Sequence, residues 1–349
     1  MGIAEFMVEF FFEYGMFLAK VVTVVVSIAV VLILIAGMSR REPQSGGIKV
    51  EKLNDKYRGM ADALQQAVLN KASWKKREKQ EKKQEKKHLK AATTKEDHRK
   101  RLFVLDFKGD IRATAVASLR EEITAVTSVA TDKDEVVLRL ENPGGTVHEH
   151  GLAASQLARI TERGIPLIVI VDKVAASGGY MMACIGDRII AAPFAVIGSI
   201  GVIAQIPNFN RALENKGIDF EQITAGKYKR TVTMFGRNTE EDREKLKEEL
   251  EDVHVLFKLL IGRHRPNLDI ESVATGEHWY GTRAGELGLI DEIGTSDDYL
   301  VAAVPDADIF KVSYRGKQTF QEKLMAAFES SVDRIGLWMA DRQNRSQYH

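Results

Sequence analysis

Short apolar runs alternate with stretches of helical periodicity from residue 102 to residue 171, and this alternation strongly constrains the fold. The apolar runs are Leu102–Phe107, Glu135–Leu140 and Pro166–Val171, and the helical stretches between them are Val116–Val129 and Leu152–Arg163. Strands separated by helices of this length pair in parallel, because each helix carries the chain back along the sheet. The sequence therefore predicts an α/β fold. Periodicity alone does not distinguish a doubly wound sheet from other α/β arrangements.

A glycine-rich turn, Asn142-Pro143-Gly144-Gly145, directly follows the second apolar run. Two glycines after a strand allow positive φ angles and let backbone N–H groups approach a ligand closely. Such N–H groups can stabilise the oxyanion of a tetrahedral intermediate. The alternative for this motif taken alone is an ordinary turn between a strand and a helix.

A serine and a lysine stand in two further short motifs. Ser177 lies in Ala176–Tyr180, just after an apolar strand, and Lys229 lies in Thr224–Arg230. A serine hydroxyl becomes a useful nucleophile beside a base, and a lysine amine that has lost its proton can be that base. Burial lowers the pKa of a lysine by the roughly two to three units that this requires. The pair predicts a hydrolase.

Five motifs occur in a fixed order along the chain. They are Asn142–Gly145, Val174–Ala183, Ile197–Val202, Ala225–Lys229, and Gly281–Ala284 together with Gly288–Glu292. This series resembles the signal peptide peptidase A family of serine peptidases, in its SohB-type branch. The resemblance extends from the apolar N-terminus to about residue 294.

The resemblance implies a fold and a catalytic pair. The fold is a ClpP/crotonase-like spiral of ββα units over residues 102–305, preceded by one N-terminal transmembrane helix. Ser177 is then the nucleophile and Lys229 the general base, since the family motif places the base two residues beyond Lys227. The lysine takes the hydroxyl proton as the serine attacks a peptide carbonyl, and delivers it to the leaving amine. Such a reaction uses no cofactor.

Three glycines and a second serine complete the expected site. The N–H groups of Gly178 and of either Gly144 or Gly145 are expected to stabilise the oxyanion. The nucleophile is expected at a helix N-terminus, where the helix dipole favours negative charge. Ser199, from the third motif, is expected to hydrogen-bond the catalytic lysine and hold it in line.

The N-terminal 40 residues are expected to form a membrane anchor. Val21–Met38 is a run of 18 residues without a charge, and as a helix it spans about 27 Å, close to the hydrocarbon thickness of a bilayer. The preceding segment is acidic and the run exceeds a normal signal-peptide core, so the helix is expected to be retained. A second uncharged run, Ile189–Asn210, contains proline and glycine and is expected to form buried strand and turn.

Residues 41–101 are expected to form a basic linker. Tyr57, Met60, Leu64 and Val68 recur at helical spacing and predict a short amphipathic helix. Residues 75–101 hold 13 Lys/Arg and 5 Asp/Glu, a net charge of +8, although the whole chain carries only +1. The stretch is typical of a solvated spacer, and contact with anionic lipid headgroups is the alternative. Nucleic acid is not an expected partner, because no recognition motif accompanies the charge.

Two apolar stripes at helical spacing follow the lysine motif. The first follows a helix start at Thr239 and comprises Leu246, Leu250, Val253, Phe257 and Leu260. The second lies in residues 306–349, which are expected to form a C-terminal helical extension. The first stripe is most simply a core face, and a subunit contact is the alternative. The second could pack on a neighbouring subunit or lie on the membrane, and the sequence does not decide between these. Together with the resemblance, the stripes predict a homo-oligomer.

Two other kinds of reactive side chain do not point to a site. Cys184 is the only cysteine, and its apolar neighbours favour a small buried hydrophobic residue over a catalytic thiol. His148 and His150 flank Glu149, but histidines at this spacing do not share a helix face and no third ligand cluster accompanies them. No metal site is therefore expected.

The sequence as a whole predicts a serine endopeptidase of the bacterial inner membrane, anchored by a single span and cleaving unfolded or membrane-derived peptides. The alternatives are a crotonase-like acyl-CoA enzyme and a non-catalytic membrane-tethered scaffold. Lys/Arg excess follows the apolar run, so the charge bias places the catalytic domain in the cytoplasm. Family relatives work on the outer face of the membrane, which favours a periplasmic domain. We expect the cytoplasmic placement from the charge bias.

Overall fold

The computed structural model describes residues 12–27, 46–70 and 99–316. Residues 48–315 cluster into one compact unit, and the helix formed by residues 12–27 belongs to a second unit. Among these three described ranges, no helix combines the length and the apolar character needed to cross a bilayer. The expected membrane helix, Val21–Met38, is helical as far as Ser27, and its remainder lies outside the described residues.

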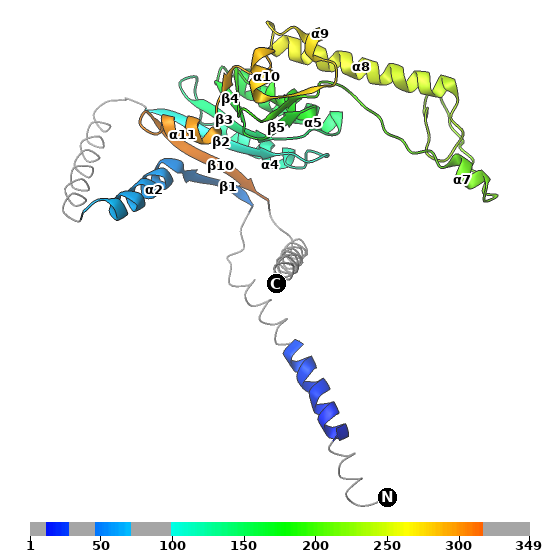
Figure 1. Ribbon diagram of the computed structural model, residues 1–349, viewed down its shortest axis with the longest axis horizontal. Coiled ribbons are helices and arrows are strands. Elements are labelled where there is room, and N and C mark those ends of the chain that lie inside the picture. Colours follow the sequence, from blue (N-terminus) through cyan, green and yellow to red (C-terminus); the bar gives the residue numbers. More distant parts are fainter. Residues whose placement is uncertain (1–11, 28–45, 71–98, 317–349) are drawn as a thin grey trace, which may run out of the picture. The chain divides into compact units, whose positions relative to one another are not determined.

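The larger sheet has seven strands in the order β1-β10-β2-β3-β4-β6-β9 (Figure 1). Their bounds are Gly47–Lys52 for β1, Ala307–Arg315 for β10, Lys100–Lys108 for β2, Glu135–Glu141 for β3, Leu167–Val171 for β4, Arg188–Ala191 for β6 and Glu292–Ile293 for β9. Every neighbouring pair from β10 to β9 is parallel. The α/β class predicted from the alternation is therefore confirmed.

The central strands of this sheet are buried on both faces, which is why their sequences are almost continuously apolar. Leu105 and Leu138 join the core on the face that carries α4 (Val116–Thr127) and α5 (Val147–Thr161). Their neighbours Val104 and Val137 face the opposite side, against α2 (Leu53–Val68) and α11 (Ser296–Ala303). The period of two along each strand thus fills two separate cores.

A smaller sheet contains β5 (Val174–Ala176), β7 (Val196–Gly198) and β8 (His278–Tyr280). β5 and β7 are parallel, β7 and β8 are antiparallel, and Asn142 forms a parallel bridge to Ala175. Three successive passes of the chain therefore run from the large sheet toward the small one: β3 to Asn142, β4 to β5, and β6 to β7. Their ends meet at one edge of the small sheet, where α6 (Gly178–Ala183) begins.

Two expectations about the ends of the compact unit differ from the structure. The predicted amphipathic helix is confirmed as α2, but α2 and β1 pack on the large sheet, so the unit begins well inside the expected linker 41–101. Residues 306–349 were expected to be helical, and β10 instead occupies their first part because Ala307, Ile309 and Val312 alternate into the two cores. The expected stripe beyond Phe320 lies outside the described residues.

The uncharged run Ile189–Asn210 is confirmed as strand and turn, since it contains β6, β7 and the loop between them. Pro193, Gly201 and Pro207 lie in its connections, and Gly198 ends β7. The short helix α7 (Asn210–Glu214) begins at its last residue.

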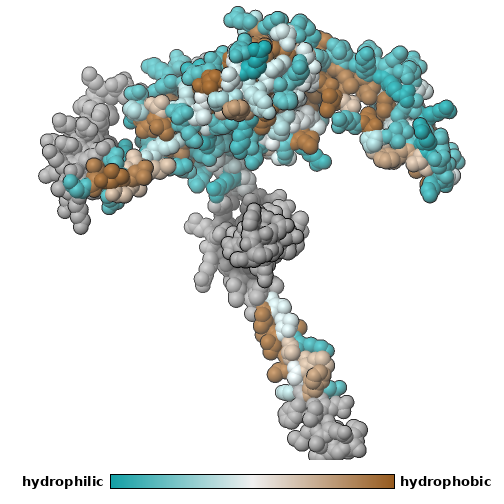
Figure 2. All heavy atoms as spheres, viewed as in Figure 1, coloured by the Kyte–Doolittle hydropathy of each residue, from teal (hydrophilic) through white to brown (hydrophobic). Residues whose placement is uncertain are grey.

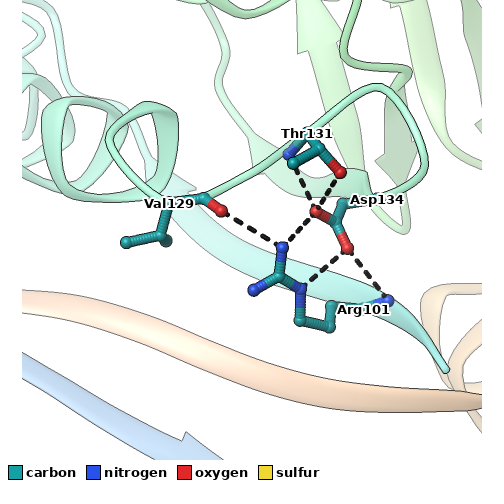
Figure 3. A network of polar contacts seen from close by, with 4 residues as sticks. All are labelled: Arg101, Val129, Thr131 and Asp134. Atoms are coloured by element: carbon teal, nitrogen blue, oxygen red, sulfur yellow. Dashed lines mark hydrogen bonds and ion pairs between the residues drawn. The ribbon is translucent and has the colours of Figure 1, made fainter. Parts of the chain in front are cut away.

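An ion pair between the half-exposed Arg101 and the buried Asp134 fixes the start of β2 (Figure 3). Arg101 donates from two guanidinium nitrogens to Asp134 and from one of them to Val129 O. The backbone N–H and hydroxyl of Thr131 donate to the same carboxylate. Burial opposes ionisation of Asp134, but these four contacts outweigh it and lower the pKa of Asp134 to about 2. The loop before β3 is thus attached to the start of β2.

Residues 203–238 form a segment that we call the arm, and it leads into the long helix α8 (Glu240–His264). The predicted helix start at Thr239 is confirmed, with a capping box to Asp242. No residue of the arm is buried. Its hydrogen bonds, ion pairs and ring contacts join it to itself or to the start of α8, as in the bond from Phe209 N–H to Met234 O. The arm and α7 extend away from both sheets (Figure 1).

The remaining helices are α9 (Ile270–Val273) and α10 (Gly281–Glu286), which lie between α8 and β9. Only Phe257 and Ile261 of α8 are buried, where the helix packs on the main core. The expected stripe from Leu246 to Val253 is half-buried. Figure 2 shows apolar residues exposed along α8 and over the arm.

Candidate active site

Ser177 occupies the sharp turn between β5 and α6 and is half-buried. Its backbone has φ 52° and ψ −120°, a conformation that is costly for a residue with a side chain. The turn is held by the Ser177 N–H, which donates to Gly198 O at 2.7 Å, and by the Ser177 carbonyl, which accepts the Met181 N–H at 3.0 Å. A strained turn from strand to helix projects a nucleophilic side chain out of the sheet, as in other hydrolases.

The glycine loop lies directly against Ser177. A side chain at Gly144, which has φ +93°, would place its Cβ 2.7 Å from Ala176 O and 2.8 Å from Ser177 Cβ. A Cβ at Gly145 would lie 2.1 Å from Ile111 O. The two glycines are therefore required by close backbone approach, and the loop is more than an ordinary strand-to-helix turn.

The hydrogen bonds of this region show which of the expected oxyanion donors are free. The Gly144 N–H donates to Asn142 Oδ1 at 2.9 Å, so it is already used. In the described part of the chain, the N–H groups of Gly145 and Gly178 have no hydrogen-bond partner. Of the two loop glycines considered from the sequence, Gly145 is therefore the one with a donor to offer beside Gly178.

Ser199 stands in the equivalent turn of the next strand. The parallel register of β5 and β7 pairs Ala176 with Gly198, so Ser177 and Ser199 follow at the same edge of the small sheet. Ser199 also has φ 52°, and its N–H donates to Glu277 O at 2.6 Å. The structure thus brings Ser177, Ser199 and the three glycines together, although their motifs are separated in the sequence.

Lys229 is not part of this cluster. It lies in the arm, exposed, and its backbone N–H donates to Gly226 O at 3.2 Å. No described contact joins it to Ser177 or Ser199, and the walls expected from residues 189–207 do not enclose it. Its neighbour Lys227 pairs with Glu241 at 2.9 Å, and that carboxylate raises the pKa of Lys227.

Asn142 and His150 are the polar residues of the site that sequence reasoning left without a role. Both side chains are completely buried. The His150 ring lies against Gly178, where a Cβ would come within 2.4 Å of His150 Cγ. Asn142 was visible only as the first residue of a motif, and His150 only as one of two histidines considered for a metal. A pattern of polar residues in sequence does not reveal that two of them meet beneath a turn.

The buried position expected for Cys184 is confirmed. Cys184 is buried in the main core, and burial raises the pKa of its thiol to about 12. His148 is exposed and His150 is buried, so the two rings do not converge. Within the ranges that the structure covers, no three His, Cys, Asp or Glu side chains cluster in a way that would hold a metal.

Comparison with known proteins identifies the family of this chain. The sequence model described as the N-terminal part of peptidase family S49 matches residues 9–157, and that of peptidase family S49 matches residues 159–309. The chain is 48% identical to a probable protease SohB of Buchnera aphidicola subsp. Acyrthosiphon pisum over 92% of this chain and 93% of that protein. It is 45% identical to a probable protease SohB of Haemophilus influenzae, over 95% of this chain and 97% of that one.

Among solved structures, a membrane-bound stomatin-specific protease in complex with a substrate peptide matches with a TM-score of 0.41 and 15% identity. The match covers 66% of this chain and 98% of that chain. With near-complete coverage by relatives at 45–48% identity, the chain belongs to peptidase family S49, in its SohB-type branch, and is a serine peptidase.

Proposed function

We propose that this chain is a membrane-anchored serine endopeptidase, built on a ClpP/crotonase-like spiral, with Ser177 as nucleophile and Lys229 as general base. The observation that supports it most directly is the strained turn at Ser177, flanked by two N–H groups without a partner. The three passes from the large sheet to the small one fit the repeated unit of such a spiral.

The proposed reaction begins when neutral Lys229 takes the proton from Ser177 Oγ as that oxygen attacks the peptide carbonyl. The N–H groups of Gly145 and Gly178 donate to the oxyanion. The lysine then gives its proton to the leaving amine, and a water molecule that loses its proton to the lysine hydrolyses the acyl-enzyme. Ser199, beside the nucleophile, is placed to accept a hydrogen bond from an incoming lysine.

We propose that the base comes from the arm of another copy. Nine large apolar side chains of the arm are exposed: Ile203, Ile206, Phe209, Ile218, Phe220, Ile223, Tyr228, Met234 and Phe235. A soluble surface rarely exposes so much apolar area unless something packs on it. Packing of the arm on a second copy would bury these residues together with Lys229. Loss of water around a lysine lowers its pKa, which is what a lysine base requires.

The proposed substrates are extended chains, unfolded or derived from the membrane. The nucleophile lies in a turn at the edge of a sheet, and neighbouring arms would leave room for a single strand of polypeptide. The anchor is proposed to span residues 21–38, with the catalytic unit on the cytoplasmic side as the charge bias indicates. Protease added to intact spheroplasts tests this side: digestion of residues 99–316 before lysis would contradict it.

The test of the function is cleavage of a denatured protein by the detergent-solubilised full-length chain. Ser177→Ala and Lys229→Ala are each expected to reduce cleavage to background while the oligomer remains intact by sedimentation. Lys227→Ala is the matched control, because its side chain pairs with Glu241 and is expected to contribute little. Full turnover in the Ser177→Ala variant would overturn the proposed function. Equal losses at Lys227 and Lys229 would reassign the base.

A further inference from the structure

The buried pair of Asn142 and His150 lies directly beneath the proposed oxyanion hole. Asn142 continues from β3, and its backbone N–H donates to Val174 O at 2.8 Å while its carbonyl accepts the Ala176 N–H at 3.1 Å. The residue is therefore fixed to β5, the strand that ends at Ser177. Its side chain can move only by rotation of the amide group.

The Asn142 amide has three polar neighbours. Oδ1 accepts the Gly144 N–H at 2.9 Å, and His150 Nε2 lies 3.2 Å from the same oxygen. Nδ2 is directed toward Met182 Sδ at 3.2 Å, a weak acceptor. Because a backbone N–H can only donate, the amide atom that faces Gly144 is the oxygen, and a proton on His150 Nε2 would let the ring donate to the same atom.

The proton on His150 Nε2 therefore decides how the amide is oriented. If Nε2 lacked a proton, the favourable arrangement would turn Nδ2 toward the ring and leave the Gly144 N–H without an acceptor. A buried N–H without a partner is costly, so the Gly144 peptide would shift. The next peptide carries the free N–H of Gly145, and it would move with its neighbour.

The same imidazole contacts the other side of the site. A Cβ at Gly178 would lie 2.4 Å from His150 Cγ and 2.6 Å from His150 Cδ2, so the ring packs directly against the Gly178 backbone. Nδ1 of the same ring lies 2.9 Å from Thr146 O, a second acceptor, so a neutral ring donates to one of the two oxygens and a ring with both protons donates to both. One side chain thus touches Gly178 directly and reaches Gly144 through Asn142.

We propose that His150 is a positioning residue that sets the separation of the two oxyanion donors, Gly145 N–H through Asn142 and Gly178 N–H through its ring. This inference rests on the proposed function, because it assigns those two N–H groups to the oxyanion. His150 itself touches no reacting atom. Its two ring nitrogens face Asn142 Oδ1 and Thr146 O and its ring packs against the Gly178 backbone, so we assign it no role as a base or a metal ligand.

The kinetic test compares three variants of the full-length protein in detergent. His150→Phe keeps the ring against Gly178 and removes the donor, and kcat should fall about 10- to 100-fold with KM within about twofold, as for a weakened oxyanion hole. His150→Gln restores an N–H donor and should recover most of kcat. His148→Phe is the matched control on the same helix, since His148 is exposed, and it should behave as wild type.

Asn142 supplies a second pair of variants if His150→Phe fails to fold. Asn142→Asp keeps an oxygen toward both Gly144 and His150 and should retain most of kcat. Asn142→Leu has a similar size without the oxygen and should lose about as much as His150→Phe. Wild-type kcat in Asn142→Leu, or equal losses in His150→Phe and His150→Gln, would overturn the inference.

Hydrogen exchange separates this inference from the proposed function. The Gly144 N–H should be protected in the wild type and should exchange at least about tenfold faster in His150→Phe, measured by mass spectrometry on peptides covering residues 142–146. This readout does not depend on activity. A wild type without peptidase activity would defeat the proposed function alone, whereas unchanged exchange in both His150→Phe and Asn142→Leu would defeat the positioning role alone.

Discussion

The turn at Ser177 and the arm that carries Lys229 differ in how fully one chain determines them. The turn is held by backbone hydrogen bonds and lies beside glycines at which an added Cβ would come too close to neighbouring atoms. The arm has no buried residue and exposes Ile223 to 93%. One half of the proposed dyad is therefore prepared by the fold, and the other half depends on what covers the arm.

This difference also separates two kinds of physical control. Around Ser177, small changes in shape matter because close-packed backbone cannot move aside. In the arm, a single substitution should have little effect on the isolated chain. It should matter when the apolar surface of the arm is buried between copies. Substitutions near Ser177 should therefore lower kcat, whereas substitutions in the arm should weaken assembly.

The largest expected effect comes from mixing two inactive proteins. Ser177→Ala and Lys229→Ala copies, denatured together and refolded, should regain about a quarter of wild-type cleavage, because about one site in four then receives an intact pair from two neighbours. Each variant refolded alone should stay at background. Activity that remains at background in the mixture, although sedimentation shows mixed oligomers, would place both dyad residues in one chain.

Gly144→Ala should act on the prepared half. Its Cβ would lie 2.7 Å from Ala176 O and 2.9 Å from Gly178 N, so the loop must move away from Ser177 and kcat should fall about 100-fold. Gly151→Ala is the matched control, because that glycine lies in α5 with open space around it. It should keep full activity and gain up to about 1 kcal/mol of stability. A wild-type rate in Gly144→Ala would show that the close approach is not needed for catalysis.

Ile223→Asp should act on the other half. A charge at this exposed position of the arm should weaken assembly and lower activity at least about tenfold at fixed concentration, because an unpaired carboxylate would be buried between copies. The thermal midpoint of the single chain should change little. Val129→Asp, at an exposed apolar position at the end of α4, is the control for added charge. Unchanged sedimentation in Ile223→Asp would remove the arm from the interface.

The smallest expected effect concerns the ion pair of Asp134 with Arg101, which belongs neither to the turn at Ser177 nor to the arm. The folded pKa of Asp134 is lowered from 3.8 to about 2, so its ion pair stabilises the fold above pH 3.8 and this contribution is lost as the pH falls toward 2. Asp134→Asn should lower the free energy of unfolding at neutral pH by about 1–3 kcal/mol and flatten its decline in acid. Asp132→Asn, at an exposed neighbouring position, should keep the wild-type profile, and an equal loss there would refute the assignment.

The parts of the site that sequence could predict are those tied to strand ends. Ser177, Ser199 and the glycine loop each follow a strand, so parallel pairing brings them to one edge of the small sheet. The position of Lys229 could not be predicted in this way, because its motif lies in the arm and follows no strand of either sheet. The pairing of Asn142 with His150 depends on a tertiary contact between β3 and α5. Strand β10 was not predicted, because its alternating apolar residues lie at the start of residues 306–349, which were expected to be helical.

A lone copy of this chain keeps its nucleophile and its proposed base apart, and it would therefore be a latent enzyme without any propeptide. Newly made protein would stay inert while dilute, and activity would rise steeply with the concentration of the chain. If the chain is anchored as proposed, confinement to the membrane would raise that concentration and so promote the active assembly. The cell would be protected from a stray protease by mass action alone.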